Sequence, residues 1–302
     1  MDIKKISVVG AGMMGRMIAF VFASKYSVGV YDVRHVDIKT GIREDARHVV
    51  SDAEIERRLA KISFTTQIDS TMISNADLVI EAIFEDMELK RKAFAWLEES
   101  CRPDCVFCTN TSVMSPSEIS RDLRRRERFL ATHFWNPAHL IPLVEVVKSD
   151  ATSHETAQTV MDILTDIGKK PVLCKKDVPG FIANRLQHAL WREAFYMVQE
   201  GIADAKTVDD ACKYGPGLRW PVMGPMENSD MVGIELTRNI HEYVLKSLAD
   251  NHEPSPLLQE MLGRGELGMK SGKGWQDWTP QQISASNNGL RKHLIKCNIS
   301  NK

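Results

Sequence analysis

Short apolar runs alternate with helix-like patterns along the first half of the chain. The runs cover residues 6–9, 27–31, 62–64, 77–83, 105–109, 128–132 and 143–147, and a last run covers 171–174. The segments between them, such as Met13–Ser24 and Met87–Glu99, show the periodicity of helices. Strands that alternate with helices indicate a mostly parallel sheet with helices on both faces. The sequence therefore predicts an α/β fold for this part of the chain.

The pattern changes beyond Pro179 and Gly180. From there the sequence is helical, with loops at residues 214–217 and 220–225. A Pro-Gly pair at the point where an α/β pattern gives way to helices predicts a domain boundary. We therefore expect an α/β domain over residues 1–178 and an all-α domain over residues 179–302, close to the usual size of about 150 residues per domain. We expect the polar segment after Gln281 to be a frayed tail.

The charge balance excludes several classes of partner. The chain has 39 Lys and Arg residues against 40 Asp and Glu residues, a net charge of −1. Such a balance gives no long-range attraction to nucleic acid or to an anionic membrane. The apolar stretch Met17–Ala23 is too short to span a bilayer, and no basic region with a cleavage site precedes it. We expect a cytoplasmic protein without a signal peptide, a nucleic-acid partner or a membrane partner.

Three of the six cysteines are close together in the sequence, at Cys101, Cys105 and Cys108. Their spacing raises the possibility of a zinc site. However, the chain has no second Cys or His pair at finger-like spacing, and residues 105–108 have the pattern of a buried strand. We therefore expect reduced, buried thiols and no bound metal.

A glycine pattern follows the first apolar run. It reads Gly10-Ala11-Gly12-Met13-Met14-Gly15 and opens the first predicted helix. A G-x-G-x-x-G pattern between a strand and a helix is the fingerprint of a Rossmann-like dinucleotide site. Gly10 permits the tight turn, Gly12 lets the backbone approach the pyrophosphate, and Gly15 lets the helix pack close to the strand. The first N–H groups of the helix, at Met13 and Met14, are expected to face the phosphates.

Asp32 ends the second predicted strand, twenty residues after Gly12. An acid at this point is placed to accept hydrogen bonds from the ribose hydroxyls of the adenosine. Its charge repels a 2′-phosphate and so favours NAD over NADP. Arg34, two residues further on, weakens that preference slightly because an arginine can pair with such a phosphate.

A histidine and a glutamate stand twelve residues apart in the next group of polar residues. His133 closes a predicted strand, residues 134–142 form a loop, and Glu145 lies in the following strand. The loop can return the chain so that the imidazole and the carboxylate meet. A histidine held by a carboxylate suits alcohol–ketone interconversion, because one ring nitrogen takes the hydroxyl proton while the acid stabilises the imidazolium. From these two residues alone, an ordinary histidine with an unrelated acid remains an alternative.

Taken together, the motifs resemble those of the L-3-hydroxyacyl-CoA dehydrogenase family over essentially the whole chain. They occur in family order at Gly10–Gly15, Asp32, Val79–Glu85, Asn110–Ser112, His133–Pro137, Leu143–Val147 and Asp177–Arg185. The resemblance implies that His133 is the general base and Glu145 its orienting partner. It implies that Ser112 and Asn184 hydrogen-bond the substrate oxygen. With Asn184 at the start of the second domain, the site would lie in an interdomain cleft.

The resemblance also implies a cofactor, an assembly and a substrate. NAD would be lined on its nicotinamide or ribose side by Glu85, Lys90, Asn110, Ser112, Asn136 and Lys270. The family fold joins a Rossmann-like domain to a helical domain that supplies most of a homodimer interface. The activity implied is NAD-dependent oxidation of an L-3-hydroxyacyl-CoA, a reaction of fatty acid metabolism.

Two departures from the family pattern concern the substrate. Members that act on CoA thioesters usually carry a longer, lysine-rich excursion after the second strand, whereas residues 33–62 are shorter here and mixed in charge. Many such members also place a lysine near the position of Pro142, and this loop lacks that cation. Both features are similar to branches that act on small acids, such as the gulonate, carnitine and pyridine-carboxylate dehydrogenases. A free hydroxy acid or aldehyde-acid therefore remains an alternative substrate.

A third hypothesis is a non-catalytic NAD-binding or structural protein, like the lens crystallin of this family. The chain retains the whole set of residues that the family uses for catalysis, namely Ser112, His133, Glu145 and Asn184. Retention of the complete set argues against a structural role.

Overall fold

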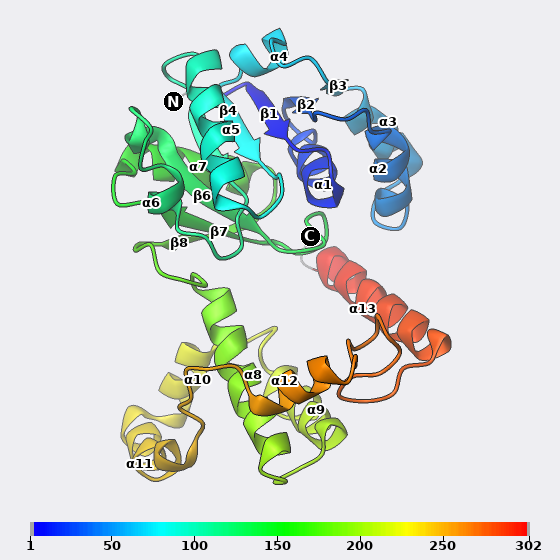
Figure 1. Cartoon of the computed structure of the whole chain (residues 1–302), viewed down its shortest axis with the longest axis vertical. Coiled ribbons are helices and arrows are strands. Elements are labelled where there is room, and N and C mark those ends of the chain that lie inside the picture. The colour runs from blue at the N-terminus through cyan, green and yellow to red at the C-terminus, as the bar shows by residue number, and fades with distance from the viewer. Residues whose placement is uncertain (1–2, 301–302) are drawn as a thin grey trace. The chain divides into compact units, whose positions relative to one another are not determined.

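The computed structural model describes residues 3–300, with side chains as far as Cys297. The chain forms two compact units, coloured along the sequence in Figure 1. The first unit runs as far as Ala183 and takes in the end of the chain from Lys292; the second is Asn184–Arg291. Each unit is described by itself.

An eight-stranded sheet, in the order β3-β2-β1-β4-β5-β6-β7-β8, forms the centre of the first unit. Its strands are β1 (Lys5–Val9), β2 (Ser27–Tyr31), β3 (Ile62–Thr65), β4 (Leu78–Glu81), β5 (Val106–Thr109), β6 (Phe129–Phe134), β7 (Leu143–Lys148) and β8 (Lys170–Cys174). Neighbouring strands run parallel, except that β6 and β7 are antiparallel. The predicted Rossmann-like, mostly parallel sheet is confirmed.

Helices cover both faces of this sheet. One face carries α1 (Met13–Phe22), α2 (Ile38–Ala46), α3 (Asp52–Leu59) and α7 (His154–Asp166), whose apolar side chains join a single buried cluster. The other face carries α4 (Thr71–Ser74), α5 (Met87–Ser100) and α6 (Pro116–Ile119), which build a second cluster. Strand residues alternate between the two, as Ile80 and Val79 of β4 do. This two-sided burial explains why the strands are continuous apolar runs rather than alternating ones.

Helices also make up the second unit, as the sequence predicted. They are α8 (Ala183–Gln199), which begins in the last residue of the first unit, α9 (Ala205–Tyr214), α10 (Pro225–Val232), α11 (Ile234–Val244), α12 (Pro256–Gly263) and the start of α13 (Pro280–Ser300). The described residues also form three short 3-10 turns: η1 (Arg126–Arg128) in the first unit, and η2 (Pro216–Leu218) and η3 (Leu245–Ser247) in the second. Of the residues that the structure describes, no helix is both long and apolar enough to cross a membrane.

The expectation of a frayed tail after Gln281 was wrong, because residues 280–300 form helix α13. The start of this helix carries a reciprocal pair of hydrogen bonds. The backbone N–H of Gln282 donates to Thr279 Oγ1 at 3.2 Å, and the backbone N–H of Thr279 donates to Gln282 Oε1 at 2.8 Å. This is a capping box, and its signature, a threonine with a glutamine three residues later, was visible in the sequence.

Candidate active site

The glycine loop between β1 and α1 has the shape that a dinucleotide pyrophosphate requires. Gly10 has a φ of 104°, and a Cβ there would lie 2.5 Å from the carbonyl oxygen of Ala82. A Cβ on Gly15 would lie 1.8 Å from the carbonyl oxygen of Gly10, whereas one on Gly12 would meet no described heavy atom within 4 Å. Among the described side chains none caps α1 or places an acid in its first turn. The loop therefore fits NAD, with open space in front of a helix N-terminus.

Asp32 lies beside this loop, just beyond the end of β2. Its Oδ2 accepts a hydrogen bond from the Ala11 N–H at 2.8 Å, and its Oδ1 accepts one from the Arg34 N–H at 3.0 Å. The carboxylate thus fixes the glycine loop, a contact that the sequence did not predict. Each carboxylate oxygen has two lone pairs, so the predicted bonds to ribose hydroxyls are compatible with these contacts.

A buried ion pair lies where β4 and β5 end. Glu81 and Lys90 are both fully buried, and Lys90 Nζ lies 2.7 Å from Glu81 Oε1. Thr109, opposite Glu81 on β5, donates its hydroxyl to Glu81 Oε2 at 2.6 Å, and the Ile83 N–H donates to Oε1 at 2.8 Å. No role was predicted for Glu81 from the sequence. A charged residue at the end of a continuous apolar run is the signal that could have indicated one.

Glu85 connects this ion pair to the loop after β5. Its carboxylate lies 3.3 Å from Lys90 Nζ and accepts hydrogen bonds from the Thr111 hydroxyl and, at 3.0 Å, from the Ser112 N–H. Partial burial acts to raise the pKa of Glu85, but the bonds from Thr111, Lys90 and Ser112 outweigh it and lower that pKa. Glu85 therefore stays ionised and holds the backbone of Ser112 in place.

The same loop is joined to β6 by Asn110. Its side-chain oxygen accepts a hydrogen bond from the Phe134 N–H at 2.9 Å, and its own N–H donates to the Glu81 carbonyl at 2.7 Å. Asn110 thus ties the buried ion pair to the strand that carries His133. The exposed side chain of Ser112 lies two residues further along this loop.

His133 and Glu145 meet as the sequence predicted. They are directly opposite each other on the antiparallel strands β6 and β7, so their side chains lie on the same face of the sheet. His133 Nδ1 lies 2.8 Å from Glu145 Oε2, and both side chains are buried. A carboxylate at this distance fixes the proton on Nδ1 and leaves Nε2 as the proton acceptor.

Glu145 has three further hydrogen-bond donors. Trp135 Nε1–H donates to Oε2 at 3.2 Å, while the N–H groups of Ile182 and Ala183 donate to Oε1 at 2.9 and 2.8 Å. Burial acts to raise the pKa of Glu145, but these bonds, with that of His133 the largest among them, lower it below its ordinary value. The carboxylate is therefore ionised, and it also caps the start of α8.

An unusual backbone turn brings those N–H groups to Glu145. Gly180 has a φ of 76° and Phe181 a φ of 52°, which is uncommon for a residue with a side chain. Phe181 is almost fully buried, packs with Ala131 and Val147, and lies edge-on to His133 with ring centroids 5.8 Å apart. Burial of this ring stabilises a turn that would otherwise cost about 1–2 kcal/mol.

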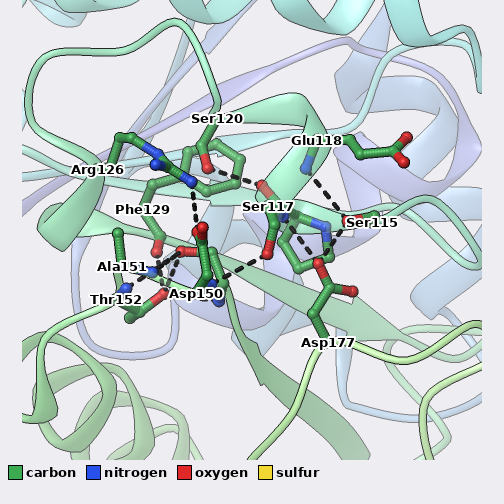
Figure 2. Close-up of polar contacts among 12 residues, drawn as sticks. Ser115, Ser117, Glu118, Ser120, Arg126, Phe129, Asp150, Ala151, Thr152 and Asp177 are labelled. Atoms are coloured by element: carbon green, nitrogen blue, oxygen red, sulfur yellow. Dashed lines mark hydrogen bonds and ion pairs between the residues drawn. The ribbon is translucent and has the colours of Figure 1, made fainter.

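The start of the same connection is fixed to α6, as Figure 2 shows. The Asp177 carboxylate accepts hydrogen bonds from the Ser115 hydroxyl and, at 2.9 Å, from the Ser117 N–H. Ser117 in turn accepts a hydrogen bond from the Asp150 N–H at 3.0 Å. Residues 177–183 are thus held at both ends. Asp177 binds to the start of α6, and the N–H groups of Ile182 and Ala183 bind to Glu145 of β7.

A buried lysine holds the loop between β6 and β7. Lys169 Nζ donates to the carbonyl oxygens of Ala138 and, at 2.8 Å, of Ile141. Burial lowers the pKa of Lys169 to about 8. The loop that it fixes carries the exposed residue Asn136. Nothing in the sequence signals this contact, because a glycine followed by lysines, here Lys169 and Lys170, is common on protein surfaces.

Two predicted site residues lie in the second unit. Asn184 is in the first turn of α8, and Lys270 is exposed in a turn that the Gly268 N–H closes on the Lys273 carbonyl at 2.7 Å. Their roles remain predictions. All the other predicted site residues lie in the first unit, around the carboxyl ends of β1, β2, β4, β5 and β6.

Of the two cysteines predicted to lie in a strand, Cys108 does so, whereas Cys105 lies one residue before the strand begins. Cys108 is in β5 and fully buried, and burial raises the pKa of its thiol to about 12. Cys101 and Cys105 are also buried and free. Within residues 3–300 the structure places no three His, Cys, Asp or Glu side chains together as a metal site.

Comparisons with known proteins agree with this geometry. Residues 5–178 match the family model "3-hydroxyacyl-CoA dehydrogenase, NAD binding domain", and residues 180–278 match the model of the C-terminal domain. A probable 3-hydroxybutyryl-CoA dehydrogenase of Bacillus subtilis is 35% identical over 92% of this chain and 98% of its own length. The 5-formyl-3-hydroxy-2-methylpyridine 4-carboxylate 5-dehydrogenase of Mesorhizobium japonicum is 30% identical over 94% of this chain and 93% of its own length.

A solved structure extends the comparison to the fold. A crystal structure described as a 5-formyl-3-hydroxy-2-methylpyridine 4-carboxylic acid 5-dehydrogenase, an NAD+-dependent dismutase, is similar with a TM-score of 0.87 and 30% identity, over 98% of each chain. Family models that cover most of the chain, together with relatives of this identity, place it among NAD-dependent oxidoreductases. The chain belongs to the 3-hydroxyacyl-CoA dehydrogenase family, and its cofactor is NAD.

Proposed function

We propose that this protein interconverts an L-3-hydroxyacyl-CoA, such as 3-hydroxybutyryl-CoA, and the corresponding 3-ketoacyl-CoA. The observation that carries the proposal is the buried pair of His133 and Glu145, with 2.8 Å between Nδ1 and the carboxylate. In alcohol oxidation, His133 Nε2 takes the hydroxyl proton while Glu145 stabilises the imidazolium that forms. In ketone reduction the imidazolium returns this proton to the oxygen.

Bound NAD supplies the nicotinamide that accepts hydride from the substrate carbon. We propose that Ser112 and Asn184 donate hydrogen bonds to the substrate oxygen, where charge changes during the reaction. We propose that NAD is held by Gly10, Gly12, Met13, Met14, Gly15, Asp32, Glu85, Lys90, Asn110, Ser112, Asn136 and Lys270. Residues 1–178 would then form the cofactor domain and residues 179–302 the domain for substrate and assembly.

The test of the substrate is NADH formation from L-3-hydroxybutyryl-CoA, or NADH consumption with acetoacetyl-CoA. We expect turnover with at least one acyl chain length, because the relatives named above include a probable 3-hydroxybutyryl-CoA dehydrogenase. Absence of turnover with every CoA thioester would contradict this substrate.

A second candidate substrate is a small free hydroxy acid or aldehyde-acid. Two arginines near the segment after β2 are paired with acids of the same unit: Arg16 lies 2.7 Å from Asp45, and Arg43 lies 2.7 Å from Glu56. Paired arginines offer less attraction to the phosphates of CoA than unpaired ones. The similarity to a pyridine-carboxylate dehydrogenase favours the same candidate. Matched pairs of thioester and free acid, compared by kcat/KM with NAD, distinguish the two substrates.

We also propose that the protein is a homodimer, in which a second copy covers apolar side chains of the helical unit. Helix α11 exposes a stripe of such side chains, among them Leu236, Ile240 and Tyr243. Light scattering over a range of protein concentrations tests this assembly, and a monomer mass throughout would contradict it.

We place the protein in the cytoplasm, where its six free thiols would stay reduced. Fractionation of cells tests this location.

A further inference from the structure

Trp135 supplies the second side-chain hydrogen bond to Glu145, and neither the family motifs nor the comparisons assign it a role. We propose that Trp135 is a positioning residue: its indole N–H holds the Glu145 carboxylate and limits the pull of that carboxylate on the imidazole of His133. The inference rests on the proposed function, in which His133 exchanges a proton with the substrate.

The strand geometry brings the three side chains together. Side chains two residues apart on a strand point to the same face, so Trp135, just beyond the end of β6, points the same way as His133. Glu145 lies directly opposite His133 on β7. The rings of Trp135 and His133 are tilted by 51° with centroids 5.6 Å apart. Both nitrogens therefore reach the same carboxylate oxygen, at 3.2 and 2.8 Å.

The hydrogen bonds leave the carboxylate little freedom. A carboxylate has two oxygens and about four lone-pair sites. Oε2 accepts from His133 and Trp135, and Oε1 accepts from the N–H groups of Ile182 and Ala183. All four sites thus have a donor. Two donors are backbone groups and a third is the proposed base, so Trp135 is the donor that a change of side chain can remove while the reacting group stays intact.

Sharing one oxygen has an electrostatic consequence. A hydrogen bond from the indole withdraws negative charge from Oε2, and this bond is one of those that lower the pKa of Glu145. Less charge on Oε2 means weaker stabilisation of the imidazolium at the same oxygen. Without the indole N–H, the carboxylate would favour the protonated ring more strongly, so the base would become neutral only at higher pH.

The pH dependence of the reaction measures this effect. For alcohol oxidation we expect Trp135→Phe to move the acid limb of the kcat/KM profile to higher pH by about half a unit, a factor of about three in rate on that limb. For ketone reduction, which needs the protonated ring, the alkaline limb should move in the same direction. Trp96→Phe is the matched control, because Trp96 packs against Tyr31 of β2 and is not among the described donors to Glu145. Lower rates with both limbs unmoved would overturn the proposal.

A spectroscopic measurement reads the contact without substrate. The indole N–H resonance of Trp135, assigned by its loss in Trp135→Phe, should move when Glu145→Gln replaces the charged acceptor with a neutral one. The indole resonance of Trp96 should stay in place. If the chemical shift of the Trp135 indole N–H stayed unchanged in Glu145→Gln, the proposal would also be overturned.

A second variant guards against a protein that does not fold. Trp135→Leu also lacks the indole N–H, so it should move the same limbs of the pH profile as Trp135→Phe.

If the wild type turned over none of the substrates above, the proposed function would fail. The histidine ring resonances of the variants would still report the inference, because the pH midpoint of the His133 signal, assigned with His133→Gln, should rise in both Trp135 variants and stay unchanged in Trp96→Phe.

Discussion

The two units differ in how much of their own apolar surface they bury. The first unit packs three buried clusters around its sheet, and the pair of His133 and Glu145 lies inside that packing. The second unit, which the structure describes throughout, buries three residues: Ala249, Ser255 and Met261. Its exposed side chains include Val222 and Tyr243, each 85% exposed. The first unit therefore carries its own core, whereas the helices of the second expose apolar side chains that the proposed second copy would cover.

Helix α8 shows the difference within one element. It is a 17-residue helix with no buried residue along it, yet its first residue is held by the fully buried Glu145. The proposed chemistry thus lies where the backbone is fixed by a core, and the proposed assembly lies where it is not. Changes in the first unit should alter activity or stability directly, and changes on the second should alter association.

The largest effect is expected at the centre of the first unit. His133→Gln removes the proposed base and should lower kcat by about 10²–10⁴-fold, the usual contribution of a positioned general base. NAD affinity, measured by calorimetry, should change little, because the glycine loop and Asp32 are untouched. His139→Gln, a histidine without an assigned role, is the control. Wild-type kcat in His133→Gln would remove the basis of the proposed mechanism.

The next effect concerns the packing that holds the site. Phe181→Ala deletes an almost fully buried ring beside His133 and should lower the free energy of unfolding by about 3–5 kcal/mol. Phe84→Ala is the matched control, because Phe84 is 73% exposed, and it should change stability by about 0.5 kcal/mol or less. Denaturant unfolding measures both. Equal losses in the two variants would show that the first unit does not depend on this turn.

The sequence predicted the features that depend on local pattern. Apolar runs indicated the strands of the sheet, and the glycine pattern indicated the loop before α1, because a buried strand and a tight turn each constrain the residues that form them. The pairing of His133 with Glu145 also followed, since a loop between two strands brings their facing ends together. The roles of these residues came from the family resemblance and not from their spacing.

Contacts between distant segments were not predictable in this way. The bonds from Ile182 and Ala183 to Glu145 depend on a left-handed turn at Phe181, which apolar patterning does not reveal. The buried pair of Glu81 and Lys90 joins a strand end to the following helix, and a sequence shows two charges without their burial. Tertiary packing decides such contacts, so one sequence carries little trace of them.

A smaller effect is expected on the second unit. Ile240→Lys places a charge on the exposed stripe of α11 and should weaken self-association by about tenfold or more, close to 1.4 kcal/mol. Asn239→Lys places the same charge on a polar neighbour and should leave association unchanged. Sedimentation equilibrium measures both constants. If neither variant alters association, the stripe on α11 is not covered by a second copy.

The smallest effect is a pH dependence confined to the first unit. The pKa of Lys169 is lowered to about 8 in the folded protein, against an ordinary value near 10.5, so between these limits the unfolded chain binds more protons. Stability should therefore rise with pH above about 8, by about 1 kcal/mol for the first unit of pH, and show no such slope below it. Lys169→Met should lose this slope, whereas the exposed neighbour Lys170→Met should keep it. Urea unfolding at pH 7, 8 and 9 gives the difference in slope, and identical slopes in wild type and Lys169→Met would mean that the buried ammonium does not titrate there. Because the described second unit buries no charged side chain, the slope should accompany the unfolding of the sheet and not the separation of the proposed dimer.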